Sequence, residues 1–179
     1  ALSYLLLIGA CATTPNVTPT VRAQAGLPRP DRVLVNDFDV ANADSELNPD
    51  QLSTGAARTE EEIRIGRAAA RVLTGSLIEE LKSRGIEAQR ASTAAPPETN
   101  TLSIRGRFLW REKDAGTMRA RIWFYQGSGV NSRLVAQADA DVPSDLKRGA
   151  VVGSSAYAAA QEADAERMAR ELAERVARY

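Results

Sequence analysis

Two aspartates in the segment 32–40 (RVLVNDFDV) have the spacing that acid–base or metal chemistry would use. If the segment is a strand, Asp37 and Asp39 lie on one face, where paired carboxylates can hold a divalent cation or exchange protons. The chain contains no histidine, however, and no third ligand accompanies the pair. We therefore interpret the two carboxylates as polar residues at the end of a strand.

A second candidate is Ser128, which lies in a Gly-Ser-Gly stretch that could suggest a phosphate cradle or a nucleophile. A cradle needs amides from a helix N-terminus or a nest, and no helical pattern follows Ser128, so the stretch is typical of a hairpin turn. With no histidine and a single cysteine, the chain lacks a thiolate metal cluster and an internal disulfide. We expect no catalysis, no cofactor, no bound metal and no small-molecule substrate.

The third candidate is a surface formed by three predicted strands, on which arginine and aromatic side chains alternate with apolar ones. Two interpretations stay open. The face is solvated and held by cross-strand ion pairs, with arginine stacked on tryptophan, or it binds a partner, because Trp, Tyr and Arg are enriched in interface hot spots. The candidate partner surface comprises Arg105, Arg107, Arg119, Arg121, Trp123 and Tyr125, beside Arg111, Gln137, Asp139 and Asp141.

The directions of these side chains depend on strands that the hydrophobic pattern predicts. Apolar residues alternate with polar ones over 101–112, 117–126 and 133–142, which is typical of half-buried antiparallel strands joined by hairpin turns. Two further strands are expected at 32–40 and 86–90. The residues expected to point inward on the three alternating strands are Leu102, Ile104, Gly106, Phe108, Trp110, Met118, Ala120, Ile122, Phe124, Leu134, Ala136, Ala138, Ala140 and Val142.

Two helices complete the prediction. The first begins with Thr59 as N-cap in a capping box with Glu62, and ends at Gly85. Its apolar face consists of Ile63, Ala70, Leu73, Leu77 and Leu81. The second helix runs from about Ala156 to Arg178, with an apolar stripe of Ala165, Met168, Leu172, Val176 and Tyr179.

The predicted order is therefore β-α-β-β-β-β-α in one α/β domain over residues 32–179. We expect an α+β two-layer arrangement, with two helices on one face of a mixed, mostly antiparallel five-stranded sheet. The 23 basic and 23 acidic side chains give a formal net charge of zero. That balance argues against a nucleic-acid partner, which would require a basic excess.

The amino-terminal segment points to a membrane. Residues 1–10 (ALSYLLLIGA) are apolar but too short to span a bilayer, which needs about 20 residues. Residues 7–11 (LIGAC) resemble the bacterial lipobox. That resemblance implies that residues 1–10 are the remnant of a signal peptide, cleaved before Cys11, and that the sulfur and new amino group of Cys11 are acylated. Ala12, by resemblance to sorting rules, implies the outer membrane, with the domain facing the periplasm.

The remaining segment, 13–31, contains Pro15, Pro19, Pro28 and Pro30. Proline disfavours helix and favours extended backbone, so we expect residues 11–31 to form a lipidated tether between the membrane and the domain.

The domain resembles bacterial lipoproteins grouped as domain of unknown function 4410. The resemblance rests on segments 32–40 and 102–110, the helix IGRAAARVLTGSLIEELKSRG and the Gly-Ser-Gly stretch, and it covers residues 32–142. It implies a location and a fold but no activity. The expected function is that of a membrane-anchored envelope lipoprotein with an accessory or protein-binding role, attached through Cys11 and in contact with an envelope protein.

An alternative function is that of a subunit in an oligomeric envelope secretion or transport complex, since the element order is similar to that of the curli-secretion lipoprotein. A pore built from these strands would need an apolar side facing lipid. The outward side of 101–142 is rich in arginine instead, which argues against direct insertion of the strands into the membrane.

Overall fold

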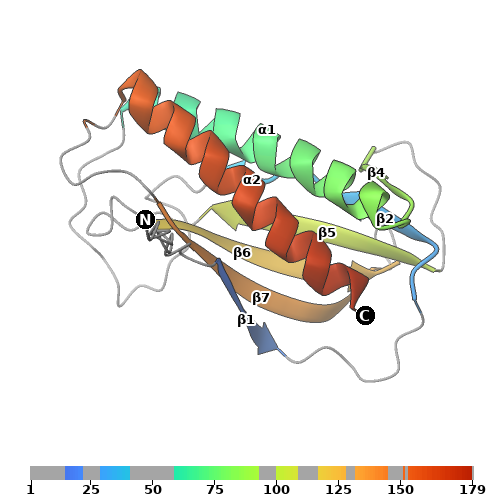
Figure 1. The fold of residues 1–179 in the computed structure, drawn as a ribbon. Coiled ribbons are helices and arrows are strands. Elements are labelled where there is room, and N and C mark those ends of the chain that lie inside the picture. The colour runs from blue at the N-terminus through green and yellow to red at the C-terminus, as the bar shows by residue number, and fades with distance from the viewer. Residues whose placement is uncertain are drawn as a thin grey trace, which may run out of the picture.

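Two helices lie on one face of a seven-stranded mixed sheet (Figure 1). The structure is a computed structural model that describes residues 15–21, 29–40, 59–92, 100–108, 117–127, 132–144, 151 and 153–178. The helices are α1 (Glu60–Ser83) and α2 (Ser155–Ala177), and the strands are β1 (Asn16–Val21), β2 (Arg32–Val35), β3 (Asp39–Val40), β4 (Ala88–Arg90), β5 (Thr101–Phe108), β6 (Thr117–Gln126) and β7 (Arg133–Pro143).

The sheet runs in the order β1-β7-β6-β5-β2-β4, and β3 also pairs with β5. Strand β2 is parallel to β4 and β5, β3 is parallel to β5, and the other pairs are antiparallel. The predicted two-layer α+β class is confirmed, but the sheet has seven strands where five were expected.

One additional strand comes from the proline-rich segment that we expected to be a tether. Strand β1 pairs antiparallel with β7, from Asn16 opposite Asp141 to Val21 opposite Gln137. Pro19 is compatible with this strand because β1 lies at the edge of the sheet, and the register shifts between Pro19 and Val21. Part of the predicted tether is therefore built into the sheet.

The other additional strand arises because segment 32–40 is not continuous. Strand β2 ends at Val35 and β3 begins at Asp39. Between them, the Asn36 backbone amide and side-chain amide both donate to the Ile104 carbonyl, at 2.9 Å and 3.0 Å, and the side-chain amide also donates to Ser103 Oγ at 3.0 Å. The interruption lets the buried Phe38 ring pack over Gly106, where a Cβ atom would lie only 2.0 Å from a ring carbon.

The capping box at the start of α1 is confirmed. The Glu62 backbone amide donates to Thr59 Oγ1 at 3.2 Å, and the Thr59 amide donates to the Glu62 carboxylate at 2.7 Å. Arg84 is the C-cap, and Gly85 follows with a φ of 73°, which favours glycine.

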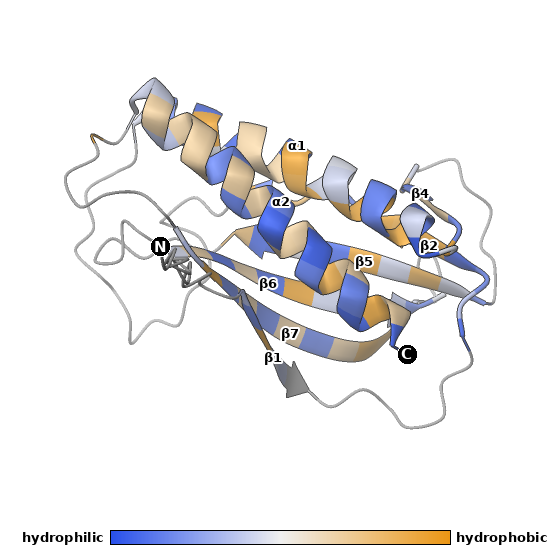
Figure 2. Ribbon diagram, in the orientation of Figure 1, coloured by the Kyte–Doolittle hydropathy of each residue, from blue (hydrophilic) through white to orange (hydrophobic). Residues whose placement is uncertain are grey.

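The hydrophobic core lies between the helices and the sheet. Hydrophobic and hydrophilic residues alternate along β6 and β7, as expected for strands with one covered face (Figure 2). Fully buried side chains from both layers meet there, including Leu73, Leu77, Leu81, Ile104, Ile122, Met168 and Leu172.

One inward position was predicted incorrectly. Leu134 lies opposite Tyr125 and is 43% exposed, whereas Val135 is buried. The register of β6 and β7 shifts between Phe124 and Tyr125, which is typical of a β-bulge. The extra residue reverses the direction of Leu134, an event that strict alternation cannot predict.

Candidate functional site

The six residues of the candidate partner surface are brought together on the face of the sheet opposite the helices. Across β5 and β6, Arg105 lies opposite Trp123 and Arg107 opposite Arg121. Across β6 and β7, the two arginines of β6 lie opposite acidic residues of β7. The predicted alternation therefore holds across this part of the sheet.

Two of the arginines are neutralised by ion pairs with β7. Arg121 donates through Nε to Asp139 Oδ1 at 2.8 Å and through Nη2 to Oδ2 at 3.3 Å, and this hydrogen bonding raises the pKa of Arg121. The Arg119 Nε atom lies 2.6 Å from Asp141 Oδ1. These contacts are the cross-strand ion pairs that the sequence suggested.

Arg105 has a different environment. Its guanidinium carbon lies 4.9 Å from the centroid of the Tyr125 ring, a cation–π distance. Among the described residues it forms no ion pair. The expected stacking partner, Trp123, is directly opposite, whereas Tyr125 is diagonal, and a long side chain reaches a diagonal neighbour readily.

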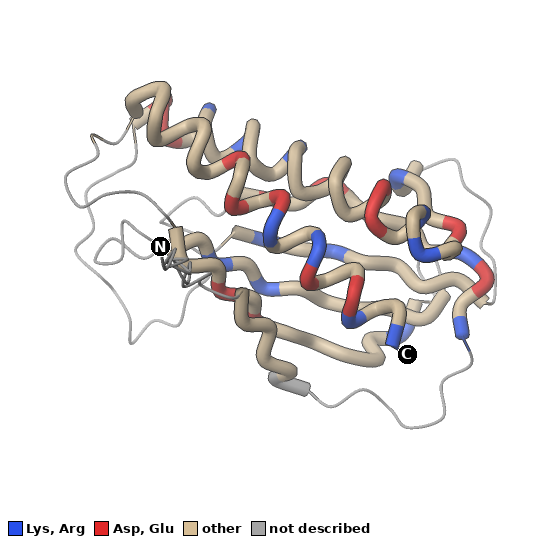
Figure 3. Tube along the Cα trace, viewed as in Figure 1, with Lys and Arg blue, Asp and Glu red and all other residues tan. Residues whose placement is uncertain are grey.

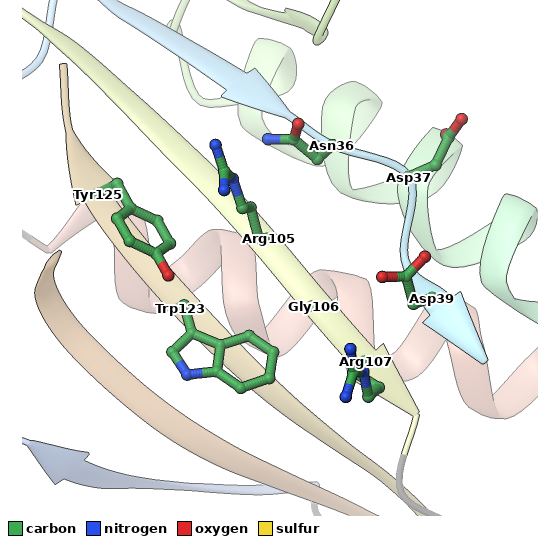
Figure 4. A pocket seen from close by; sticks show the side chains of 8 residues that line it. All are labelled: Asn36, Asp37, Asp39, Arg105, Gly106, Arg107, Trp123 and Tyr125. Atoms are coloured by element: carbon green, nitrogen blue, oxygen red, sulfur yellow. The ribbon is translucent and has the colours of Figure 1, made fainter. Parts of the chain in front are cut away.

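These side chains line an open pocket of about 430 Å³ where β2 and β3 meet β5 and β6 (Figure 4). The volume is within the range of small-ligand and hot-spot pockets. Its lining consists of Asn36, Asp37, Asp39, Arg105, Gly106, Arg107, Trp123 and Tyr125.

Asp37 and Asp39 of segment 32–40 both line this pocket, but they do not share a strand face. Figure 4 shows their carboxylates pointing in different directions, that of Asp39 toward β5 and that of Asp37 away from it. Asp37 Oδ1 lies 3.3 Å from Arg90 Nε. In the part of the chain that the structure describes, no three His, Cys, Asp or Glu side chains gather as they would around a metal ion.

The pocket depends on contacts that sequence reasoning did not anticipate. Asn36 is fixed by its two amide hydrogen bonds to β5, and its remaining oxygen is an acceptor beside the pocket. The Gly106 backbone forms part of the lining, and on the opposite side of the strand the Phe38 ring occupies the space that a side chain at this position would need. In the sequence, the only sign of this arrangement was that polar residues follow the apolar residues at the start of segment 32–40.

Some residues to which the sequence analysis assigned a role lie outside the described residues. They are Cys11, Trp110, Arg111, Ser128 and Tyr179. Of the helices in the described ranges, neither has the length and apolarity required to cross a membrane.

The model of one protein family, "Domain of unknown function (DUF4410)", matches residues 33–161. The chain belongs to the DUF4410 family. The family predicted from the sequence is thereby confirmed, and the match extends beyond residue 142 into α2. All residues that line the pocket of this DUF4410 domain lie inside the matched range.

No curated protein matches the chain. Among solved structures, it is similar to a PelC dodecamer from Paraburkholderia phytofirmans, with 13% identity over 87% of this chain and 97% of that one and a TM-score of 0.38. It is also similar to protein XCC0632 from Xanthomonas campestris, described under DUF330, with 19% identity over 87% and 90% of the chains and a TM-score of 0.47. Similarity this distant carries no information about the function of the DUF4410 domain.

Proposed function

We propose that this DUF4410 protein is a lipid-anchored envelope protein that binds a protein partner through the pocket on the helix-free face and has no catalytic activity. The observation that carries the proposal is Arg105, whose guanidinium lies over Tyr125 beside the half-buried Trp123 and pairs with no described carboxylate. Arg119 and Arg121, by contrast, form ion pairs with Asp141 and Asp139 of β7.

This arrangement supports binding because it combines hot-spot residue types with an open volume. Trp, Tyr and Arg dominate interface energetics when they fill or line a pocket that a partner desolvates. A ring-stacked guanidinium is also pre-oriented, so a partner carboxylate or carbonyl could pair with it at a low entropic cost. The proposed partner thus presents an acceptor to Arg105 and an apolar group to Trp123.

The lining supports binding over catalysis. The pocket holds neither histidine nor cysteine, and its two carboxylates point in different directions, with Asp37 close to Arg90. A nucleophile with an adjacent, oriented base is the usual requirement for covalent hydrolysis, and these residues do not provide one.

The anchor in this proposal is Cys11, acylated within the lipobox-like segment, with the outer membrane and a periplasmic orientation implied by Ala12. Two or more acyl chains give stable membrane attachment. In the full precursor, Cys11→Ser should abolish incorporation of labelled palmitate and processing at this position. Unchanged labelling would contradict the anchor but not the pocket.

The pocket is tested by crosslinking the acylated protein in its native envelope and recovering it with its partner. Trp123→Ala should reduce recovery of the crosslinked partner by about thirtyfold, the equivalent of a 2 kcal/mol hot spot. Leu134→Ala is the matched control, because Leu134 is an exposed apolar side chain on the same face and does not line the pocket. Circular dichroism should report a folded domain for both variants.

Equal partner recovery from Trp123→Ala and Leu134→Ala would exclude the pocket as the binding site. If the only partner recovered is this chain itself, the result would favour the alternative function, a subunit of an oligomeric envelope complex.

A further inference from the structure

We propose that β1 holds the domain against the lipid bilayer, with the end of the sheet at Asn16 facing the headgroups. The inference rests on the lipid anchor proposed above and goes beyond it, because it specifies which surface of the fold meets the membrane and at what distance.

Strand β1 is part of the folded domain. It is paired along its length with β7, and the Val17 side chain is only 3% exposed within the hydrophobic core. Val17 also lies beside Leu172 and Val176 of α2, where they line a small apolar recess. Strand β1 is thus attached both to the edge of the sheet and to the helix layer.

The chain between the proposed anchor at Cys11 and β1 is short. Only residues 12–15 separate Cys11 from Asn16. An extended chain spans at most about 3.4 Å per residue, so the acylated residue lies within about 17 Å of Asn16. If the domain began at β2, the intervening 20 residues would reach about 70 Å. Pairing of β1 with β7 shortens the available tether about fourfold.

The register of β1 identifies the surface that faces the membrane. Asn16 lies opposite Asp141, near the end of β7 and the start of β6. Both helices begin at this same end of the sheet (Figure 1). The short tether therefore turns this end, and not the opposite one, toward the bilayer.

Charge does not create this orientation. Acidic and basic residues are interspersed over most of the described chain (Figure 3), and the first turn of α1, which lies at the Asn16 end, carries Glu60, Glu61 and Glu62. At the Asn16 end, Arg119 and Asp141 neutralise each other. The position of the domain thus follows from the acyl anchor and the tether length, not from electrostatic attraction to anionic lipid.

The orientation also places the pocket near the membrane. Strand β5 lies three strand spacings from β1, about 14 Å, and Arg105 lies about four residues farther along the sheet than the Asn16 row, about 13 Å. The pocket then opens within about 20 Å of Asn16. A partner must consequently meet it close to the bilayer surface.

The test measures energy transfer from tryptophan to dansyl-labelled lipid in phosphatidylethanolamine–phosphatidylglycerol vesicles that carry the acylated full-length protein. Trp110→Phe leaves Trp123 as the single donor, since the chain has two tryptophans. One variant receives eight Gly/Ser residues after Thr13, before β1. The matched control receives the same insertion after Gln24, between β1 and β2.

Eight flexible residues raise the root-mean-square length of the chain between Cys11 and Asn16 from about 12 Å to about 20 Å. Because transfer to labelled lipids in the bilayer falls steeply with distance, the insertion before β1 should lower the transfer by about half. The insertion after β1 should leave transfer unchanged, since it lies beyond the point at which the chain is fixed to the domain.

Equal losses from the two insertions would overturn the inference, because they would mean that β1 is not docked and that residues 12–31 act as one tether. Transfer that neither insertion changes would overturn it as well, since the distance would then be set by something other than the tether. A protein that fails to float with the vesicles would instead overturn the lipid anchor, and flotation therefore distinguishes the two failures.

Discussion

Strand β6 presents two different surfaces. Toward the helices it carries Ala120 and Ile122, which are completely buried, whereas on the opposite side it carries Arg121 and Trp123, which are partly exposed. The inner surface is stabilised by apolar burial at close packing, where each lost methylene is costly. The outer surface is organised by ion pairs and ring contacts that cost little to change. Side chains that stabilise the core and side chains of the proposed binding surface thus alternate along one strand.

The largest effect is expected from truncation on the helix side. Leu77→Ala removes a completely buried side chain from α1 and should lower the free energy of unfolding by about 2–5 kcal/mol, measured by denaturant titration. Glu174→Ala, which breaks the exposed pair with Arg178, should cost well under about 1 kcal/mol. Similar losses for the two variants would mean that the buried faces are wrongly assigned.

A second pair of variants examines the boundary between the two surfaces. Gly106→Ala would place a methyl group into the Phe38 ring and should destabilise the domain by about 1–3 kcal/mol, as overpacking does. In Gly75→Ala the new methyl group meets no atom within 4 Å, and the helix interior should gain about 0.5–1 kcal/mol. Thermal melts should shift in opposite directions, and shifts of the same sign would contradict the close approach of Phe38.

The outer surface should respond more weakly. Arg121 and Asp139 are each about one-third exposed, at 34% and 33%, so solvent screens their pairing. A double-mutant cycle of Arg121→Ala and Asp139→Ala should give a coupling energy below about 1 kcal/mol, falling further at high salt. A coupling of several kcal/mol would show that this face contributes to stability as the inner one does.

The smallest effect concerns acid stability within the helix layer. A hydrogen bond from Arg84 holds the pKa of Glu80 below its usual range, with Arg170 of α2 also close by at 3.7 Å. A lowered carboxyl pKa stabilises the fold above the unfolded pKa, about 4.3, and this stabilisation is lost as the pH falls through the lower, folded-state pKa. The stability of Glu80→Gln should therefore differ from that of the natural protein at pH 7 and converge with it under acidic conditions.

Arg84→Gln removes the main cause of the lowered Glu80 pKa. In this variant the free energy of unfolding should therefore depend less on pH over the same range. Parallel profiles for both variants and the natural protein from pH 7 to pH 3 would exclude this ion pair as a source of acid sensitivity.

The elements that formed as predicted are those whose signals are local. Thr59 and Glu62 contain the complete capping box, and the apolar spacing that includes Leu73 and Leu77 defines the buried face of α1 without reference to any other element. The alternation along β6 likewise predicted which of its side chains point inward. For the candidate site, this local reasoning was sufficient to put Arg105 and Trp123 on one face.

The sequence by itself thus determined the helices, the central strands and the direction of their side chains, because each of these depends on neighbours a few residues away. Only the tertiary structure decided that a proline-containing segment would join the sheet as β1, since that depends on an open edge of β7 and on burial of Val17 against a distant helix. It also decided that Asp39 and Arg105 would line one pocket, because β3 reaches β5 only after Phe38 has packed over Gly106. Such contacts gain their free energy from residues far apart in the chain, and no local pattern records them.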